Sequence, residues 1–356
     1  MSKELNERLH AVDEAKSRQT STSTVETASP ITALRGSRRR FLAQAGLAGV
    51  GALALGQTGA LAGGSSRFPN AGFGRIADRH ILNFALNLEY LEAEFYLRAA
   101  FGTTLDPADI TGSGNNESAA NVTPGTVVGV SGTPAGDKVP FQSELIRQYA
   151  EEIATDELTH VRFLRAALGR RAVARPNIDI GPAFTAAAVA AGVIPQGQTF
   201  NPYANDTNFL LGAFLFEDVG VTAYRGALSL LSQRSNISAA GGLLGVEAYH
   251  ASEVRTVLFG LAFATQNQGL LATIQKISDL RDAADGDGSG AGNGFADDDQ
   301  GVVLNGRANI VPTDNNGLVF ARTLQQVLNI VYLTTATLGT TDSGGFFPTG
   351  LLGKIR

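Results

Sequence analysis

Apolar positions recur at helical spacing along four long stretches of the chain, and segments rich in Gly, Asn and Pro separate these stretches. The pattern predicts four long helices, at about 75–101, 140–168, 207–233 and 238–265. The candidate helix ends are Gly102 and Gly169 after the first two helices, Pro140 at the start of the second, and Asp206 and Thr207 as caps of the third.

The segments between and after these helices differ in composition. Residues 103–139 are rich in Gly, Thr, Asn and Ser, so we expect a long loop or a small strand-bearing excursion. Residues 170–205 are long enough to run the length of a bundle as a single crossover. Further helices are expected at about 269–284 and 318–336. The predicted fold is all-α: a four-helix bundle with one long crossover, a long inserted loop and a C-terminal extension.

Two short segments of the extension stand out. A Gly-rich acidic run from Asp285 resembles the first half of a calcium-binding loop, but the twelfth position is Ala296, which cannot supply the bidentate carboxylate. A solvated acidic loop at 285–301 is the better interpretation. The Gly-Gly-Phe-Phe-Pro run at 344–348 is expected to dock over an exposed apolar end of the bundle.

Four glutamates interrupt the apolar faces of the predicted helices, and two of them are followed three residues later by a histidine. In chain order the residues are Glu89, Glu157 with His160, Glu217, and Glu247 with His250. Positions i±3, i±4 and i+7 share one face of a helix, and around all four glutamates these positions are mostly apolar. A buried carboxylate must be protonated, paired or bound to a metal. Solvated faces with two ordinary core histidines are the alternative, but surface helices surround a charge with polar neighbours.

The order of these residues matches the ligand set of a two-metal carboxylate site. Such a site takes one Glu from each of two helices and one Glu-x-x-His from each of the other two. Two divalent ions would neutralise the carboxylates and use the histidine nitrogens. We expect two metal ions, because carboxylates with one imidazole per metal suit both iron and manganese. Iron is the first expectation and manganese the alternative. Two ions roughly 3.5–4 Å apart can act on O₂ or peroxide, which are the expected partners.

Composition excludes several other classes of protein. The 356 residues are 44% hydrophobic, which allows a sizeable core, and the net charge of −5 gives no basic excess for nucleic acid. The chain contains no cysteine, so disulfides, thiolate metal sites and iron–sulfur clusters are excluded.

Residues 1–62 are predicted to be an export signal that is removed. The run Ser-Arg-Arg-Arg-Phe-Leu at 37–42 resembles a twin-arginine signal, and a weakly apolar Gly/Ala-rich stretch follows it. The run Ala-Leu-Ala at 60–62 fits a cleavage site, which leaves a mature chain from about Gly63. A membrane anchor is the alternative, but the glycines and the cleavage site favour removal, with no stable span afterwards.

This organisation predicts a bundle at 63–267 and an extension at 268–356 that packs on it. The twin-arginine machinery would export the chain already folded, to the periplasm or cell envelope, which suits a metal loaded in the cytoplasm. Association into a homo-oligomer is left open by the sequence.

The two halves of the bundle have similar sequence patterns. Glu89 and Tyr96 lie seven residues apart in the first helix, as Glu217 and Tyr224 do in the third. The second and fourth helices share the Glu-x-x-His motif. The similarity indicates either a duplicated helix pair or convergence under the same ligand demand.

With these motifs placed on four helices, the chain resembles the ferritin-like superfamily over about 75–267. The run Asp-Glu-Leu-Thr-His at 156–160 is similar to the Asp-Glu-x-x-His helix of bacterioferritins. Residues 82–96, with the sequence LNFALNLEYLEAEFY, resemble the first helix of the ferritin-like group that includes plant and bacterial desiccation-related proteins. The tail around 344–348 is also similar to that group.

The resemblance implies a role for each site residue. Glu89 and Glu217 would be terminal ligands, Glu157 and Glu247 would bridge the metals, and His160 and His250 would bind one metal each. Tyr96 and Tyr224 would be the catalytic candidates, as supports of the ligands or as redox groups, with core aromatics as the alternative.

The chain also departs from the bacterioferritin pattern. There, an Asp precedes both Glu-x-x-His motifs and orients a ligand histidine, whereas here the first motif has Asp156 and the second has Val246. One histidine is therefore expected to lack its carboxylate partner. Glu92 lies one turn after Glu89 and could replace or supplement it. The inserted loop and the extension argue against a 24-subunit storage cage.

Three functions follow as hypotheses, since fold alone does not fix function. The first is an exported di-iron or iron–manganese protein that oxidises Fe(II) or removes peroxide in stress protection. The second is a manganese catalase. The third is a structural desiccation protein whose metal site contributes only stability.

Overall fold

The computed structural model describes residues 77–115, 122–286 and 299–356. The predicted export signal lies outside these residues, as does most of the acidic run that follows Asp285. None of the helices in the described ranges combines the length and the apolar character needed to cross a membrane.

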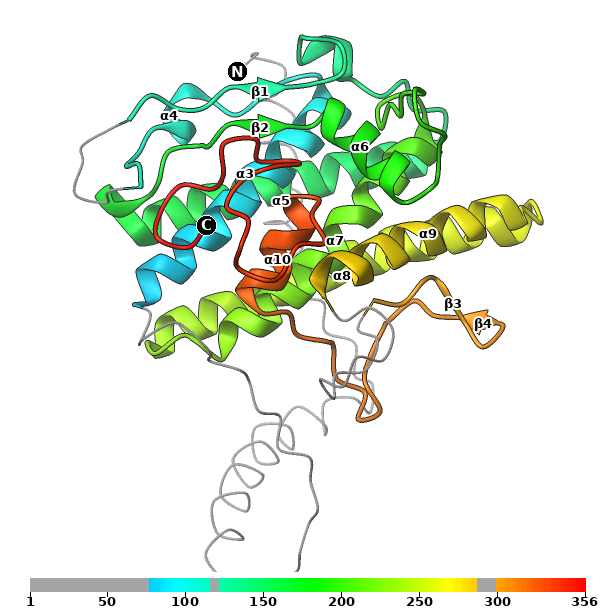
Figure 1. The fold of residues 1–356 in the computed structure, drawn as a ribbon. Coiled ribbons are helices and arrows are strands. Elements are labelled where there is room, and N and C mark those ends of the chain that lie inside the picture. Colours follow the sequence, from blue (N-terminus) through cyan, green and yellow to red (C-terminus); the bar gives the residue numbers. More distant parts are fainter. Residues whose placement is uncertain (1–76, 116–121, 287–298) are drawn as a thin grey trace, which may run out of the picture. The chain divides into compact units, whose positions relative to one another are not determined.

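Four long helices form the bundle, so the all-α prediction is confirmed (Figure 1). They are α3 (Asp78–Phe101), α5 (Glu144–Leu168), α7 (Asp206–Leu228) and α8 (Arg234–Ala264). Helix α3 packs mainly on α5, and α7 packs mainly on α8. Contacts of α3 with α7 and of α5 with α8 join the two pairs. The two halves of the bundle that are similar in sequence therefore correspond to the two packed helix pairs.

The ends of these helices agree only in part with the prediction. Gly102 ends α3 in the left-handed conformation, with φ of 66°, a conformation that glycine adopts at little cost. Helix α5 begins at Glu144 and not at Pro140, because the Ser143 side chain accepts a hydrogen bond from a backbone N–H of its first turn.

The third bundle helix is capped by Asn205, one position before the predicted caps. The side chain of Asn205 caps α7 by accepting from the backbone N–H of Asn208. Asp206, one of the predicted caps, instead accepts from the backbone N–H groups of Gln142 and Ser143 at the start of α5. It thereby joins the starts of two helices.

The inserted loop and the crossover pair with each other beside the bundle. Their short elements are α4 (Pro107–Ile110), β1 (Val127–Val128), η1 (Ala135–Asp137), η2 (Gly169–Arg171), β2 (Ile178–Asp179) and α6 (Pro182–Ala190). Strands β1 and β2 pair in parallel, so of the two alternatives for residues 103–139, a long loop or a small strand-bearing excursion, the structure has the second. Buried ion pairs tie both segments to α3: Arg98 to Asp137 at 2.8 Å, and Glu94 to Arg175.

The extension contains two helices and a small hairpin. Its elements are α9 (Gln268–Asp285), β3 (Val303–Leu304), β4 (Arg307–Ala308) and α10 (Leu324–Val331). Helix α10 is much shorter than the predicted 318–336. A capping box of Thr323 and Gln326 starts it, and Leu333 just after its end has a positive φ of 53°.

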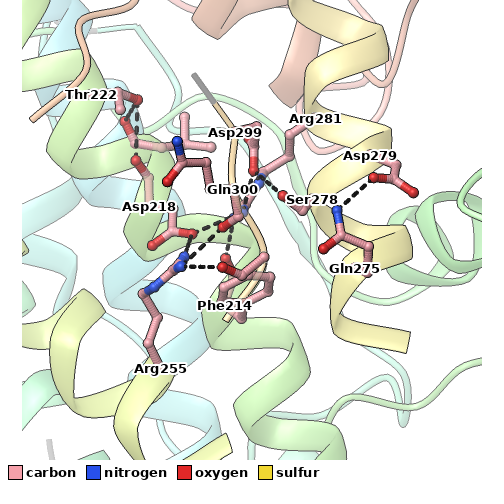
Figure 2. Close-up of polar contacts among 12 residues, drawn as sticks. Phe214, Asp218, Thr222, Arg255, Gln275, Ser278, Asp279, Arg281, Asp299 and Gln300 are labelled. Atoms are coloured by element: carbon pink, nitrogen blue, oxygen red, sulfur yellow. Dashed lines mark hydrogen bonds and ion pairs between the residues drawn. The ribbon is translucent and has the colours of Figure 1, made fainter. Parts of the chain in front are cut away.

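Buried arginines attach the extension to the bundle (Figure 2). Arg281 of α9 contacts Asp299 and the Asp218 carboxylate of α7, and its guanidinium lies 4.4 Å from the Phe214 ring centre. Arg255 of α8 reaches the same Asp218 oxygen at 2.6 Å. Both arginines have no exposed surface. A buried charge of this kind is costly once it loses its partner, so the network fixes the extension in one position.

The C-terminal tail also packs on the bundle. Phe346 and Phe347 are buried, and the Phe346 ring lies 4.9 Å from that of Phe216 on α7. Asn87 of α3 exchanges two hydrogen bonds with the backbone of Leu352. Residues 344–348 therefore dock on the bundle as expected, but against the side of α3 and α7 and not over an end of the bundle (Figure 1).

Candidate metal centre

Six side chains from the four long helices converge inside the bundle. They are Glu89 of α3, Glu157 and His160 of α5, Glu217 of α7, and Glu247 and His250 of α8. None of the six is more than 6% exposed. The helical spacing that put each glutamate on an apolar face has therefore brought all six to one interior point.

The six residues form two groups, in each of which the ligand atoms lie within 4.8 Å of one another. The first group is Glu89, Glu157, His160 and Glu247, and the second is Glu157, Glu217 and His250. Glu157 belongs to both groups, as a carboxylate shared by two cations would. Glu247, for which the resemblance implied the same role, belongs only to the first.

Both histidines present Nδ1 to the carboxylates. Nδ1 of His160 lies 3.2 Å from Glu89 Oε2 and 3.3 Å from Glu157 Oε2. Nδ1 of His250 lies 3.1 Å from Glu157 Oε1 and 3.7 Å from Glu217 Oε2. Each oxygen of Glu157 thus faces a different histidine, which places the shared carboxylate between the two groups.

Burial and mutual repulsion shift the pKa values of the carboxyl groups upward. Burial raises the pKa of Glu89 to about 7 and that of Glu217 to about 8, although the nearby histidines oppose it. Burial and the neighbouring carboxylates raise the pKa of Glu247 well above its usual range. Glu157 is the exception, because burial is outweighed by His160 and His250 and its pKa falls below the usual range.

The histidines show the complementary shifts. Burial by itself lowers the pKa of His160, but Glu157 and Glu89 outweigh it and raise the value to about 12. Burial is likewise outweighed at His250, where Asp156 and Glu157 raise the pKa to about 10. Without cations, the cluster therefore retains protons. Metal ions would have to displace them, because ligands bind as carboxylates and neutral imidazoles.

Several polar atoms at this point are buried and make no hydrogen bond. They are Glu157 Oε1, Glu217 Oε2, both carboxylate oxygens of Glu247, and His250 Nδ1. Buried polar atoms in proteins almost always have a partner, and one without a partner costs about 1–3 kcal/mol. These atoms belong to hard carboxylates and an imidazole, the donor set that iron and manganese take. The residues present therefore fit two metal ions.

The two tyrosines connect the halves of the bundle crosswise. The hydroxyl of Tyr96 on α3 donates to Oε1 of Glu217 on α7, and the hydroxyl of Tyr224 on α7 donates to Oε1 of Glu89 on α3. Burial and these carboxylates raise the pKa of both phenols well above the usual range, so they keep their protons. Glu89 and Glu217 are each left with Oε2 facing a histidine. The seven-residue spacing indicated that the tyrosines lie near the site but not which glutamate each one holds.

The expectation that one histidine lacks a carboxylate partner can be made specific. Asp156 contacts Nε2 of His250 at 3.4 Å, so the aspartate of the α5 motif orients the histidine of the other motif. The corresponding residue for His160 would come from the α8 motif, where Val246 offers no acceptor. The asymmetry is visible in the two motifs, but which histidine it affects depends on how the helices pair.

Glu92 is buried at the edge of the centre. It is 6% exposed, and burial together with Glu157 and Glu217 raises its pKa well above the usual range. A Cβ atom at Gly220 would lie 2.2 Å from Glu247 Oε2 and 3.5 Å from Glu92 Oε1, so both carboxylates approach the backbone there. Glu89, and not Glu92, is in the first ligand group.

Comparison with known proteins agrees with this geometry. The ferritin-like domain family matches residues 77–260, which span the four long helices up to Gly260. The chain is 29% identical to the desiccation-related protein PCC13-62 of Craterostigma plantagineum over 285 residues, 78% of this chain and 84% of that protein. It is 26% identical to the ferritin-like catalase Nec2 of Nesocodon mauritianus over 286 residues, 78% of this chain and 85% of that protein. No solved structure is significantly similar to it.

Proposed function

The chain belongs to the ferritin-like domain family, and on that premise we propose that it is an exported dinuclear metalloprotein that consumes hydrogen peroxide. The observation that carries the proposal is the buried cluster of four glutamates and two histidines, several of whose ligand atoms make no hydrogen bond within the protein. The relative that is named a ferritin-like catalase supports peroxide as the substrate.

Each side chain of the cluster would have its own role in metal binding. Glu157 would be shared by both ions, Glu89, His160 and Glu247 would complete one position, and Glu217 with His250 the other. Tyr96 and Tyr224 would hold the terminal glutamates so that one oxygen of each stays turned inward. Asp156 would fix the ring of His250 with Nδ1 facing the centre.

When bound, the metal pair would supply a store for two electrons. One peroxide molecule would take up two electrons and two protons and become two water molecules. A second peroxide molecule would give up two electrons and two protons and become O₂. The chain would exclude bulk water from this exchange, because the walls around the cluster are buried and mostly apolar.

The proposal is tested by measuring bound metal and O₂ release together. Protein purified from its own source is analysed for iron and manganese, and then metal-loaded protein is mixed with hydrogen peroxide. We expect about two metal ions per chain and catalytic O₂ release. Metal-replete protein that releases no O₂ would contradict the proposal.

Substitution of Glu157, the carboxylate shared by both ligand groups, is the most specific test of the centre. Glu157→Gln should lower the content of both metal positions, because Glu157 is in both ligand groups. Glu152→Gln is the matched control, since Glu152 lies on the same helix and is exposed. Two bound ions in the Glu157→Gln protein would remove the assignment of the centre.

A second candidate function is that of a structural desiccation protein. It is favoured by the similarity to the desiccation-related protein over most of both chains. In that case the metal ions would stabilise the bundle without turnover. Metal-dependent thermal stability without peroxide consumption would support it.

The proposal also covers the identity of the metal and the cellular location of the protein. Iron is proposed as the native metal and manganese as the alternative, and activity after reconstitution with each metal distinguishes them. Export is proposed from the twin-arginine run at 37–42. Replacing both Arg38 and Arg39 by Lys should retain the unprocessed chain in the cytoplasm, and normal processing of that variant would refute export by this route.

A further inference from the structure

A small cavity lies beside the metal centre, between α3, α7, α10 and the C-terminal tail. Its volume is about 30 Å³, which is room for roughly two water-sized molecules. Helix α10 supplies Ile330 and Val331 to its wall, and the tail supplies Phe346. The extension thus closes one side of a space that the four bundle helices alone would leave open.

The wall of the cavity is apolar except at its inner end. Of the residues that line it, only Glu92 and Tyr224 carry a polar side-chain atom. The Tyr224 hydroxyl donates to Glu89, one of the expected metal ligands. Gly220, which also lines the cavity, has Oε2 of Glu247 directly against its backbone. The inner end of the cavity is therefore lined by Glu92, Tyr224 and Gly220, which lie against the metal centre.

The outer end of the cavity can be located from exposure. Leu88 of α3 is the most exposed residue of the lining, so we place the opening to solvent beside its side chain. A molecule that enters there passes between apolar walls before it meets Glu92. Burying an ion between such walls costs several kcal/mol, whereas a small uncharged molecule escapes most of this penalty.

We propose that this cavity is the binding site and entry route through which hydrogen peroxide, a small uncharged oxidant, reaches the metal pair. The inference rests on the proposed function. The volume is too small for peroxides with a branched alkyl group, and the walls reject ions. Glu92 gives the entering molecule one polar partner at the inner end, where the apolar lining stops.

The first test narrows the cavity. Ala223→Leu adds methylenes to the wall from α7, and Leu88→Trp obstructs the opening at a half-buried position that tolerates a larger side chain. Because each variant narrows the path of the substrate and leaves the expected metal ligands unchanged, each should lower kcat/KM for hydrogen peroxide by about tenfold or more. Ala166→Leu, at an exposed position on α5, is the control. Metal content and thermal unfolding are measured on each protein to confirm that it is folded and loaded.

The second test does not depend on turnover. Xenon binds small apolar cavities, so ¹²⁹Xe NMR or a crystal under xenon pressure should locate it between Leu88 and Tyr224 in the wild-type protein, with or without metal. The Ala223→Leu protein should lose this binding, while Ala166→Leu should keep it.

The two tests separate failure of this inference from failure of the proposed function. If wild-type protein binds metal but consumes no peroxide, the proposed function falls and the xenon result alone decides whether the cavity admits small uncharged molecules. If peroxide is consumed at the wild-type rate by folded Ala223→Leu and Leu88→Trp proteins, the entry route is wrong. Absence of xenon from the wild-type cavity would overturn the inference as well.

Discussion

Removing a single tyrosine hydroxyl should weaken one metal position and spare the other. Tyr96 donates to Glu217, which faces His250 in the second ligand group. Tyr224 donates to Glu89, which faces His160 in the first. The Tyr96→Phe and Tyr224→Phe proteins should therefore show complementary defects.

The size of the effect follows from the ionisation of the carboxyl group. With a pKa of about 8, Glu217 is mostly protonated at neutral pH in the metal-free protein, and its bond to the phenol resembles a neutral hydrogen bond. With metal bound it must be ionised, and a hydrogen bond to a charged group contributes more than a neutral one. The difference is about 1–2 kcal/mol, or roughly fivefold to thirtyfold in Kd for one ion.

The measurement is a competition titration against a chelator, with the two binding steps resolved by metal content or by absorption. Tyr203→Phe is the matched control, because Tyr203 is also buried but its hydroxyl contacts the backbone oxygen of Ile180 at 3.4 Å. The control should bind both ions as the wild type does. Equal weakening of both ions in Tyr96→Phe, or none, would refute the crosswise support deduced here.

Two further predictions concern pH and the extension. In the folded, metal-free protein the pKa values of Glu89 and Glu217 are raised to about 7 and about 8, so the fold holds protons that the unfolded chain has lost. The stability of the metal-free fold therefore falls as pH rises through these values. The raised pKa values of His160 and His250 act in the same direction. Metal binding displaces these protons, so the gain in Tm on metal addition should widen between about pH 6 and about pH 8.5, and a gain independent of pH would contradict the assignment. Arg281→Met should cost about 3–5 kcal/mol in chemical denaturation because it leaves buried carboxylates short of a partner, whereas the surface control Arg147→Met should cost less than about 1 kcal/mol.

The four bundle helices and the cluster of ligands could be predicted because both depend on local spacing. A glutamate on an apolar helix face is visible in the sequence, and so is a histidine one turn away from it. Helix ends were less predictable. Pro140 and Asp206 are residues typical of a helix start, but Ser143 and Asn205 are the ones whose side chains accept the hydrogen bonds.

What could not be predicted depends on which segments meet in three dimensions. Tyr96 and its partner Glu217 are separated by 121 positions in the sequence, so no local pattern distinguishes Glu217 from the nearer Glu89. The buried arginines are a second example. Arg255 and Arg281 occur on helices, where such residues are usually solvated, and their burial follows from the return of Asp299 and Gln300 over α7 and α8 (Figure 2).

The contacts around the centre also argue that its two ligand groups are not equivalent. The crosswise tyrosines are symmetric, because each terminal glutamate receives one phenol from the opposite helix pair. The remaining contacts break this symmetry: Asp156 supports only His250, and Glu247 joins only the ligand group of His160. One position thus has more carboxylate charge, and the other has the better-oriented imidazole. Because the two ligand groups that share Glu157 differ in this way, we expect them to bind their metal ions with different affinities. Metal binding should then occur in two separable steps.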